Sequence, residues 1–160
     1  MVTTKTSRAG KAGGAGRDGR AGRTVAAVKA GGARPAKRGA AKPPKLPKAV
    51  ASAVQAALDK KALDVVILDL RKAIGFTDYF VICSGTNPRQ IQAIADAIED
   101  TLKEDLGERP ALVEGVEKSE WILLDYFNFV VHVFSRDCRA FFDIERLWGN
   151  AERYEFADAP

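Results

Sequence analysis

The chain has 160 residues, with 25 Lys and Arg against 21 Asp and Glu, so its formal net charge is +4. No stretch approaches 18 consecutive apolar residues and no apolar run opens the sequence, so we expect neither a transmembrane helix nor a secretory signal. Two cysteines and one histidine, widely spaced, predict neither a disulfide framework nor a zinc site.

The charge is distributed very unevenly along the chain. Residues 1–48 contain 13 basic residues and one acid, a net charge of +12, whereas residues 49–160 contain 12 bases and 20 acids, a net charge of −8. The first segment has almost no large apolar side chains, so it cannot bury enough surface to offset the entropy lost on ordering. The sequence therefore predicts a disordered basic arm over residues 1–48 and one ordered domain over residues 49–156.

Three interpretations of the arm stay open. The first is a solvated linker. The second is a non-specific contact with RNA, in which Lys and Arg release counterions from phosphates, and the third is an organelle transit peptide. Scarce serine and frequent glycine make the transit peptide the weakest of the three, so we expect a cytoplasmic protein. The candidate RNA-contacting residues are Lys37, Arg38, Lys42, Lys45 and Lys48.

The first ordered elements follow from apolar periodicity. Apolar residues at helical spacing predict an amphipathic helix over 48–61. A β-branched run predicts a buried strand over 65–68, and a second apolar run predicts a strand over 79–83.

The strongest helix signal follows the second strand. Asn87 is a good N-cap, Pro88 fits the first helical position and Gln90 has the spacing of a capping box. Gly107 fits the position that ends the helix. One apolar stripe runs between these ends and comprises Ile91, Ile94, Ala95, Ile98 and Leu102.

The remaining elements complete an α/β pattern. Residues 108–120 are predicted as a loop, and 121–124 and 129–134 as a strand hairpin in which Asn128 accepts a left-handed backbone. A last helix is predicted over 137–148. The fold class is therefore a single small α/β domain with a mixed sheet flanked by helices.

Sites for chemistry are scarce in this pattern. Gly85-Thr86, between a strand and a helix, has a position that could hold a phosphate, but it lacks the lysine of a P-loop and the carboxylate pair of a nucleotidyltransferase. A turn with an N-cap is the favoured interpretation. His132, alone in an apolar strand, is interpreted as a hydrogen-bonded core or surface residue and not as a catalytic base. We therefore predict no catalytic residue, no metal site and no cofactor.

Several blocks of sequence together resemble one family. They are Asp78–Ile82 leading into Ser84-Gly85-Thr86, Ala93–Asp96, Glu114-Gly115, Trp121–Tyr126, Val131–Phe134, and Arg139 to Trp148. In this order they resemble the Iojap or ribosomal silencing factor family over about residues 50–152. The resemblance implies a nucleotidyltransferase-like core without catalytic carboxylates.

The resemblance also implies a function. Family members bind the large ribosomal subunit through ribosomal protein L-fourteen, block joining of the small subunit and lower translation when nutrients are scarce. Free members can form homodimers. Two alternatives stay open: a nucleotide-binding or nucleotidyltransferase-type enzyme, and a general RNA-binding protein that acts through the arm.

The same blocks supply candidate partner-binding residues. They are Asp78, Tyr79, Trp121, Asp125, Tyr126, His132, Arg139, Phe142, Asp143, Glu145 and Trp148. Nine of the thirteen aromatic residues fall between Trp121 and Tyr154, and exposed aromatics mark interfaces. We expect Tyr126 and Phe142 to be exposed anchors, with Asp125, Asp143 and Glu145 meeting basic groups at the rim.

Two positions depart from the family pattern. Phe127-Asn128 stands where a small Gly-Asp type turn is common, and Phe142 stands where tyrosine is usual. Any family hydrogen bond to that tyrosine hydroxyl is therefore absent in this chain.

Overall fold

The computed structural model describes residues 44–73 and 75–158. The predictions for Lys37, Arg38 and Lys42, and for most of the basic arm, lie outside these residues. No helix in the described part of the chain is long and apolar enough to cross a membrane.

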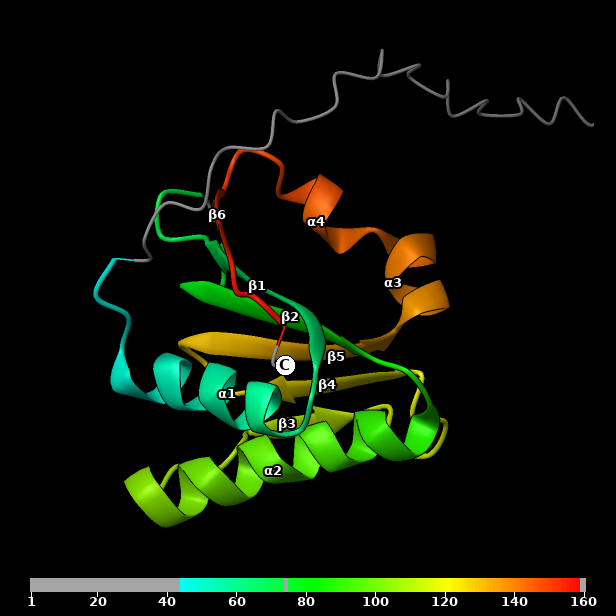
Figure 1. The fold of residues 1–160 in the computed structure, drawn as a ribbon. Coiled ribbons are helices and arrows are strands. Elements are labelled where there is room, and N and C mark those ends of the chain that lie inside the picture. Colours follow the sequence, from blue (N-terminus) through cyan, green and yellow to red (C-terminus); the bar gives the residue numbers. More distant parts are fainter. Residues whose placement is uncertain (1–43, 74, 159–160) are drawn as a thin grey trace, which may run out of the picture. The chain divides into compact units, whose positions relative to one another are not determined.

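A six-stranded sheet forms the centre of the domain (Figure 1), in the order β3-β4-β5-β2-β1-β6. The strands are β1 (Leu63–Asp69), β2 (Tyr79–Gly85), β3 (Leu112–Glu114), β4 (Trp121–Asp125), β5 (Phe129–Ser135) and β6 (Glu152–Glu155). The two central strands β2 and β5 are parallel and every other pair is antiparallel. The predicted mixed sheet is confirmed.

Helices cover both faces of this sheet (Figure 1). The long helices α1 (Lys48–Asp59) and α2 (Pro88–Leu106) lie on one face, and the short helices α3 (Arg136–Phe142) and α4 (Ile144–Leu147) on the other. The core is accordingly divided into a larger cluster beneath α1 and α2 and a smaller one beneath α3 and α4. Strand β5 is buried on both faces, which explains why its sequence is apolar apart from His132 and the terminal Ser135.

Helix α2 begins and ends where the sequence predicts. The Asn87 side chain accepts a hydrogen bond from the Gln90 amide at 2.9 Å, and Gly107 adopts a left-handed conformation with φ of 65°. The predicted apolar stripe is the buried face of the helix.

Two strands were not predicted from the sequence. β3 lies inside the predicted loop 108–120, and β6 follows the last predicted helix. Both are short edge strands, exposed except at Tyr154, so they lack the apolar alternation that identifies a strand.

Two backbone predictions were wrong in detail. The left-handed residue of the β4–β5 hairpin is Phe127, with φ of 67°, and not Asn128. The helix predicted over 137–148 is broken into α3 and α4 by Asp143, which has a φ of 42°. At Phe127 hydrogen bonds from neighbouring groups hold the backbone against the preference of a bulky residue, whereas Asp143 is a residue type that tolerates the left-handed conformation.

Candidate partner-binding surface

An open groove lies between β3, the loop that follows it and α3. Its volume is about 510 Å³. The residues that line it are Val113, Gly115, Val116, Glu117, Lys118, Glu120, Trp121, Cys138 and Phe142. The groove thus combines an apolar floor with charged side chains, on the edge of the sheet that β3 leaves unpaired.

Trp121 forms part of the groove wall and is held from three sides. Its ring stacks on Phe134 with centroids 4.8 Å apart, and Phe142 of α3 approaches it at the same centroid distance. Its indole N–H donates a hydrogen bond to Nδ1 of His132 at 3.1 Å. Phe142 itself stays 46% exposed, as predicted. The groove therefore presents a fixed indole beside a ring that a partner could cover.

A tight turn forms the opposite wall of the groove. Gly115 has a φ of 85°, and a Cβ at this position would lie 1.9 Å from the carbonyl oxygen of Trp121. Ser119 closes the turn because its amide donates to Gly115 and its hydroxyl donates to Val116. The glycine is therefore required for β3 to lie against β4 at this point.

His132 lies beneath Trp121 in the smaller core. It is buried, and Phe80 packs edge-on against it with centroids 4.7 Å apart. Burial lowers the pKa of His132 to about 4, so the ring is neutral at pH 7. Because Nδ1 accepts from Trp121, Nε2 carries the proton, and it has no partner among the described residues. The prediction of a hydrogen-bonded core histidine is confirmed.

This histidine predicts an acid-sensitive domain. The unfolded chain takes up a proton at His132 near pH 6.5 and the folded chain only near pH 4, so its contribution to stability is complete above pH 6.5 and is lost as the pH falls toward 4. At pH 5 we expect the free energy of unfolding to be about 2 kcal/mol lower than at pH 7 from this group. Urea unfolding at both pH values measures the difference. The variant His132→Gln should show a smaller difference, and an equal one would contradict this assignment.

Arg139 and Glu145 form the main ion pair of the other face. The guanidinium bonds both carboxylate oxygens of Glu145 at 3.0 Å, and it also donates to the Asp64 carbonyl at 2.8 Å and to the Ser84 hydroxyl at 3.0 Å. Only 12% of the Arg139 side chain is exposed. Burial raises the pKa of Glu145, but the hydrogen bonds and charges of Arg139 and Arg153 outweigh it, and the pKa lies below its usual value. These contacts join α3 and α4 to the sheet.

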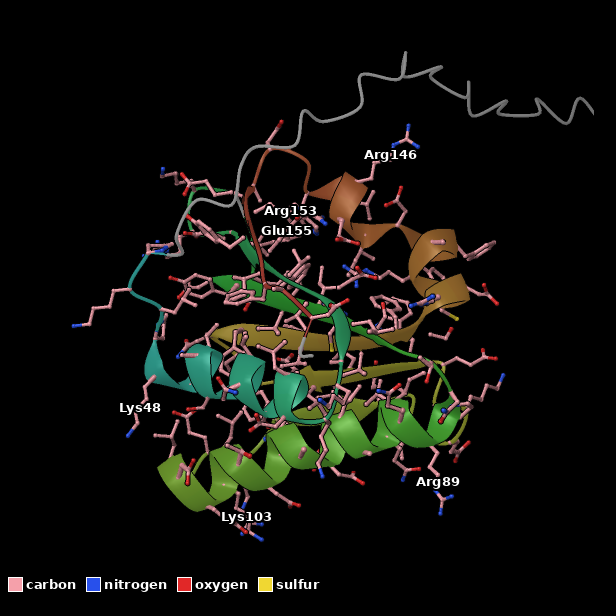
Figure 2. All side chains as sticks on the ribbon, viewed as in Figure 1. Lys48, Arg89, Lys103, Arg146, Arg153 and Glu155 are labelled. Carbon is pink, nitrogen blue, oxygen red and sulfur yellow. The ribbon has the colours of Figure 1, made fainter. Side chains whose placement is uncertain are left out.

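Arg153 of β6 extends this network. It bonds Glu145 and Glu155, and Figure 2 shows Arg153 and Glu155 side by side below α4. Both carboxylate oxygens of Glu145 therefore accept hydrogen bonds from arginines of this chain. The sequence had led us to expect that Glu145 meets basic groups of a partner at the rim of an interface. Asp143 is half-buried at the junction of the two helices, where its amide donates to the Arg139 carbonyl.

Four of the candidate residues lie at the opposite end of the sheet. Asp78 directly precedes Tyr79, the first residue of β2, and Tyr126 directly follows Asp125, the last residue of β4. Tyr126 is buried, and it stacks on Phe129 with centroids 4.8 Å apart. The prediction that Tyr126 is an exposed anchor was therefore wrong. Its ring turns toward the larger core, and burial raises the pKa of its hydroxyl, which has no partner among the described residues.

The structure thus brings together only part of the predicted site. Trp121 and Phe142 line the groove, and His132 lies beneath Trp121. Trp148 packs edge-on against Phe80 in the smaller core. The sequence missed several groove residues: Val113, Val116, Glu117, Glu120 and Cys138. The only local signal for them is the short apolar pair before Glu114-Gly115, which is too weak to predict a strand.

Side chains of α2 fill the position at Gly85-Thr86 that the sequence suggested could hold a phosphate. A Cβ on Gly85 would lie 2.7 Å from the Ile91 side chain, so glycine is needed here for close helix packing. The Gln90 side chain accepts from the amide and the hydroxyl of Thr86, and it donates to the carbonyls of Lys60 and Lys61 at the end of α1. The groups that would bind an anion are therefore engaged in a helix-to-helix link, which confirms the interpretation as a turn with an N-cap.

Fold and groove together define a small mixed α/β domain with an open apolar groove beside an edge strand. A family model described as "Ribosomal silencing factor during starvation" matches residues 43–160. The chain belongs to this ribosomal silencing factor family, RsfS, and the resemblance seen in the sequence is confirmed.

Named relatives agree with this membership. The chain is 41% identical to ribosomal silencing factor RsfS of Halalkalibacterium halodurans, over 64% of this chain and 87% of the relative. It is 41% identical to the Bacillus subtilis RsfS, over 58% of this chain and 78% of the relative. A solved structure from Chromobacterium violaceum superposes with a TM-score of 0.61 at 35% identity, covering 63% of this chain and 83% of that one. Family membership supports a ribosome-associated silencing role.

Proposed function

We propose that this chain binds the large ribosomal subunit through ribosomal protein L-fourteen and sterically blocks joining of the small subunit, which represses translation when nutrients are limiting. Its family and the names of its relatives support this proposal. The protein acts in the cytoplasm, residues 1–48 serve as a separate arm, and the free protein can pair with a second copy. No catalytic step is required.

The groove beside β3 is the observation that carries the proposal. Partly exposed aromatic rings in an apolar groove are the usual anchors of protein interfaces, and Phe142 beside Trp121 has this arrangement. Strand β3 also leaves one row of backbone groups unpaired among the described strands. An apolar segment of the partner can therefore both cover the rings and bond the strand.

Charge favours a basic protein as this partner. Residues 49–160 have a net charge of −8, and two carboxylates, Glu117 and Glu120, line the groove together with one lysine, Lys118. Ribosomal proteins are generally basic, so opposite charge accelerates their encounter with this domain, whereas the same charge repels bare rRNA. The effect on translation then depends only on how long the site stays occupied, because a bound domain physically excludes the other subunit.

Removal of the exposed ring tests the proposal. We expect Phe142→Ala to weaken binding to large subunits by about 1–3 kcal/mol, because the ring is lost from the groove. Co-sedimentation with separated subunits in sucrose gradients measures the binding, and the same gradients show whether reassociation with small subunits is restored.

Matched variants make this experiment specific. Phe142→Tyr keeps the ring and should bind like the unmodified chain, and Leu147→Ala removes an exposed apolar side chain outside the groove and should have no effect. Purified L-fourteen should compete with the subunits for the protein. A folded Phe142→Ala variant that still co-sediments fully and still blocks reassociation would refute the groove as the docking site.

A further inference from the structure

A second open pocket lies at the carboxyl ends of the two parallel strands, β2 and β5. Its volume is about 420 Å³. The ion pair of Arg139 and Glu145 lines it, together with Asp64, Ser84, Arg136, Ala140 and Asp143. None of these residues lines the groove at β3, so the pocket is a separate site.

The topology of the sheet favours ligand binding at this place. Strands β2 and β5 are parallel neighbours, but β2 leads into α2 on one face of the sheet and β5 leads into α3 on the other (Figure 1). In open α/β sheets, the crevice at the carboxyl ends of two such strands is the common site of a small ligand. Ser84, near the end of β2, and Arg136, directly after β5, both line the pocket at this crevice.

Arg139 gives the pocket a fixed cationic group. Four hydrogen bonds from its N–H groups reach the Glu145 carboxylate, the Asp64 carbonyl and the Ser84 hydroxyl. A guanidinium has one N–H more than these bonds use, and this N–H has no partner among the described residues. The Arg139 side chain is only 12% exposed, so a ligand in the pocket is the natural acceptor for this donor.

Three other charged side chains of the lining are uncommitted. The side chains of Arg136, Asp64 and Asp143 form no hydrogen bond or ion pair with the part of the chain that the structure describes. Both aspartates have an uncommon backbone conformation, with φ of 48° at Asp64 and 42° at Asp143, and Asp64 lies where the register of β1 with β2 shifts. Such backbone irregularities are frequent beside binding sites.

The lining determines the chemistry of the ligand. Two arginines can bind an anionic group, and the two uncommitted aspartates can bind a cationic one. With Glu145 included, the lining carries three carboxylates against two guanidinium groups, so a further negative charge on the ligand is disfavoured. Ala140 is the only apolar lining residue, so a large apolar group would find little surface to cover.

We propose that this pocket binds a free α-amino acid with a short, neutral, polar side chain. Arg136 and the remaining N–H of Arg139 bind its carboxylate, and Asp64 and Asp143 bind its ammonium group. Hydrogen bonds to charged groups at both ends fix the orientation of the ligand and strengthen its binding. The site takes a small molecule, in contrast to the groove at β3, which fits a protein.

Thermal unfolding of the full chain in the presence of single amino acids tests the pocket. L-serine, L-asparagine and L-glutamine, each at about 10 mM, should raise the unfolding midpoint by a few degrees, because a ligand that binds only the folded chain stabilises it. L-leucine and L-glutamate should raise it less, because leucine finds little apolar surface and glutamate adds a negative charge. N-acetylserine lacks the ammonium group and serinamide lacks the carboxylate, so neither should have an effect.

Matched variants assign the effect to this pocket. We expect Arg136→Gln and Asp143→Asn each to weaken serine binding about tenfold, measured by titrating serine against the unfolding midpoint. Arg146→Gln and Asp137→Asn remove the same charges from exposed positions outside the pocket and should leave serine binding unchanged. Without an amino acid, all four variants should unfold close to the midpoint of the unmodified chain.

Three results would overturn the proposal. They are no shift with any of the three polar amino acids, a shift with N-acetylserine or serinamide equal to that with serine, and serine binding that Arg136→Gln and Asp143→Asn leave unchanged. The measurement involves no ribosome and no residue of the groove. Its outcome is therefore independent of the proposed docking to the large subunit.

Discussion

Replacement of Arg139 by alanine is expected to destabilise the domain by about 3–5 kcal/mol. The substitution removes both bonds to Glu145 and the bonds to Asp64 and Ser84, and it leaves a largely buried carboxylate with only Arg153 as a partner. The loss of one of the two arginine partners of this buried carboxylate is the costly part of the change. Equilibrium unfolding in urea at pH 7 measures it.

Two further variants separate the buried charge from the loss of packing. Arg146→Ala removes an exposed arginine of the neighbouring helix and should change stability by less than about 0.5 kcal/mol. The double variant Arg139→Leu/Glu145→Leu leaves no unpaired carboxylate, so it should be less destabilised than Arg139→Ala. If the double variant is the less stable of the two, the charge explanation is wrong.

Substitution of Gly115 by alanine is expected to have the second large effect, a loss of about 3 kcal/mol. The new methyl group would overlap the carbonyl oxygen of Trp121, so β3 would have to move away from β4. The proposed binding to the large subunit should fall as well, because this turn forms one wall of the groove.

Gly107→Ala provides the matched control for this prediction. Gly107 also has a positive φ, of 65°, but nothing lies within 4 Å of a Cβ there. The Gly107→Ala substitution should therefore lower the free energy of unfolding only by the backbone strain, about 1 kcal/mol. Equal losses for the two variants, measured by urea unfolding, would show that the contact with Trp121 is unimportant.

Local signals in the sequence predicted the long elements well. Asn87, Pro88 and Gly107 determine the ends of α2 through their own side chains and backbone preferences, so no knowledge of the partner strands is needed. Strand β5 is apolar on both faces and needs no partner to be recognised as buried.

Elements that depend on distant residues were missed. β6 is mostly polar and exists because its residues pair with β1, more than eighty positions earlier. The break at Asp143 interrupts a continuous apolar pattern, and the ion pair of Arg139 and Glu145 spans it. Such contacts cannot be read from spacing along one helix.

The candidate site was predicted only in part for the same reason. The sequence named Trp121 and Phe142 as candidates, and the structure places both in the lining of the groove. The sequence could not show that Tyr126 turns inward onto Phe129, because the alternation of buried and exposed side chains along a strand does not continue into a turn. It also could not show that Val113 and Val116 line the groove.

The parallel pairing of β2 with β5 has a consequence for how the domain is assembled. Tyr79 of β2 pairs with Phe129 of β5, so forming the centre of the sheet brings together residues some fifty positions apart in the chain. Both long helices pack on this sheet, so their buried faces are covered only once β2 and β5 have paired. The N-terminal half supplies β1 and β2 and the C-terminal half supplies the other four strands, so the six-stranded sheet is complete only after the two halves have joined. We therefore expect slow, all-or-none folding, in which a truncated or nascent chain lacks the six-stranded sheet until the C-terminal strands and helices have joined the N-terminal ones.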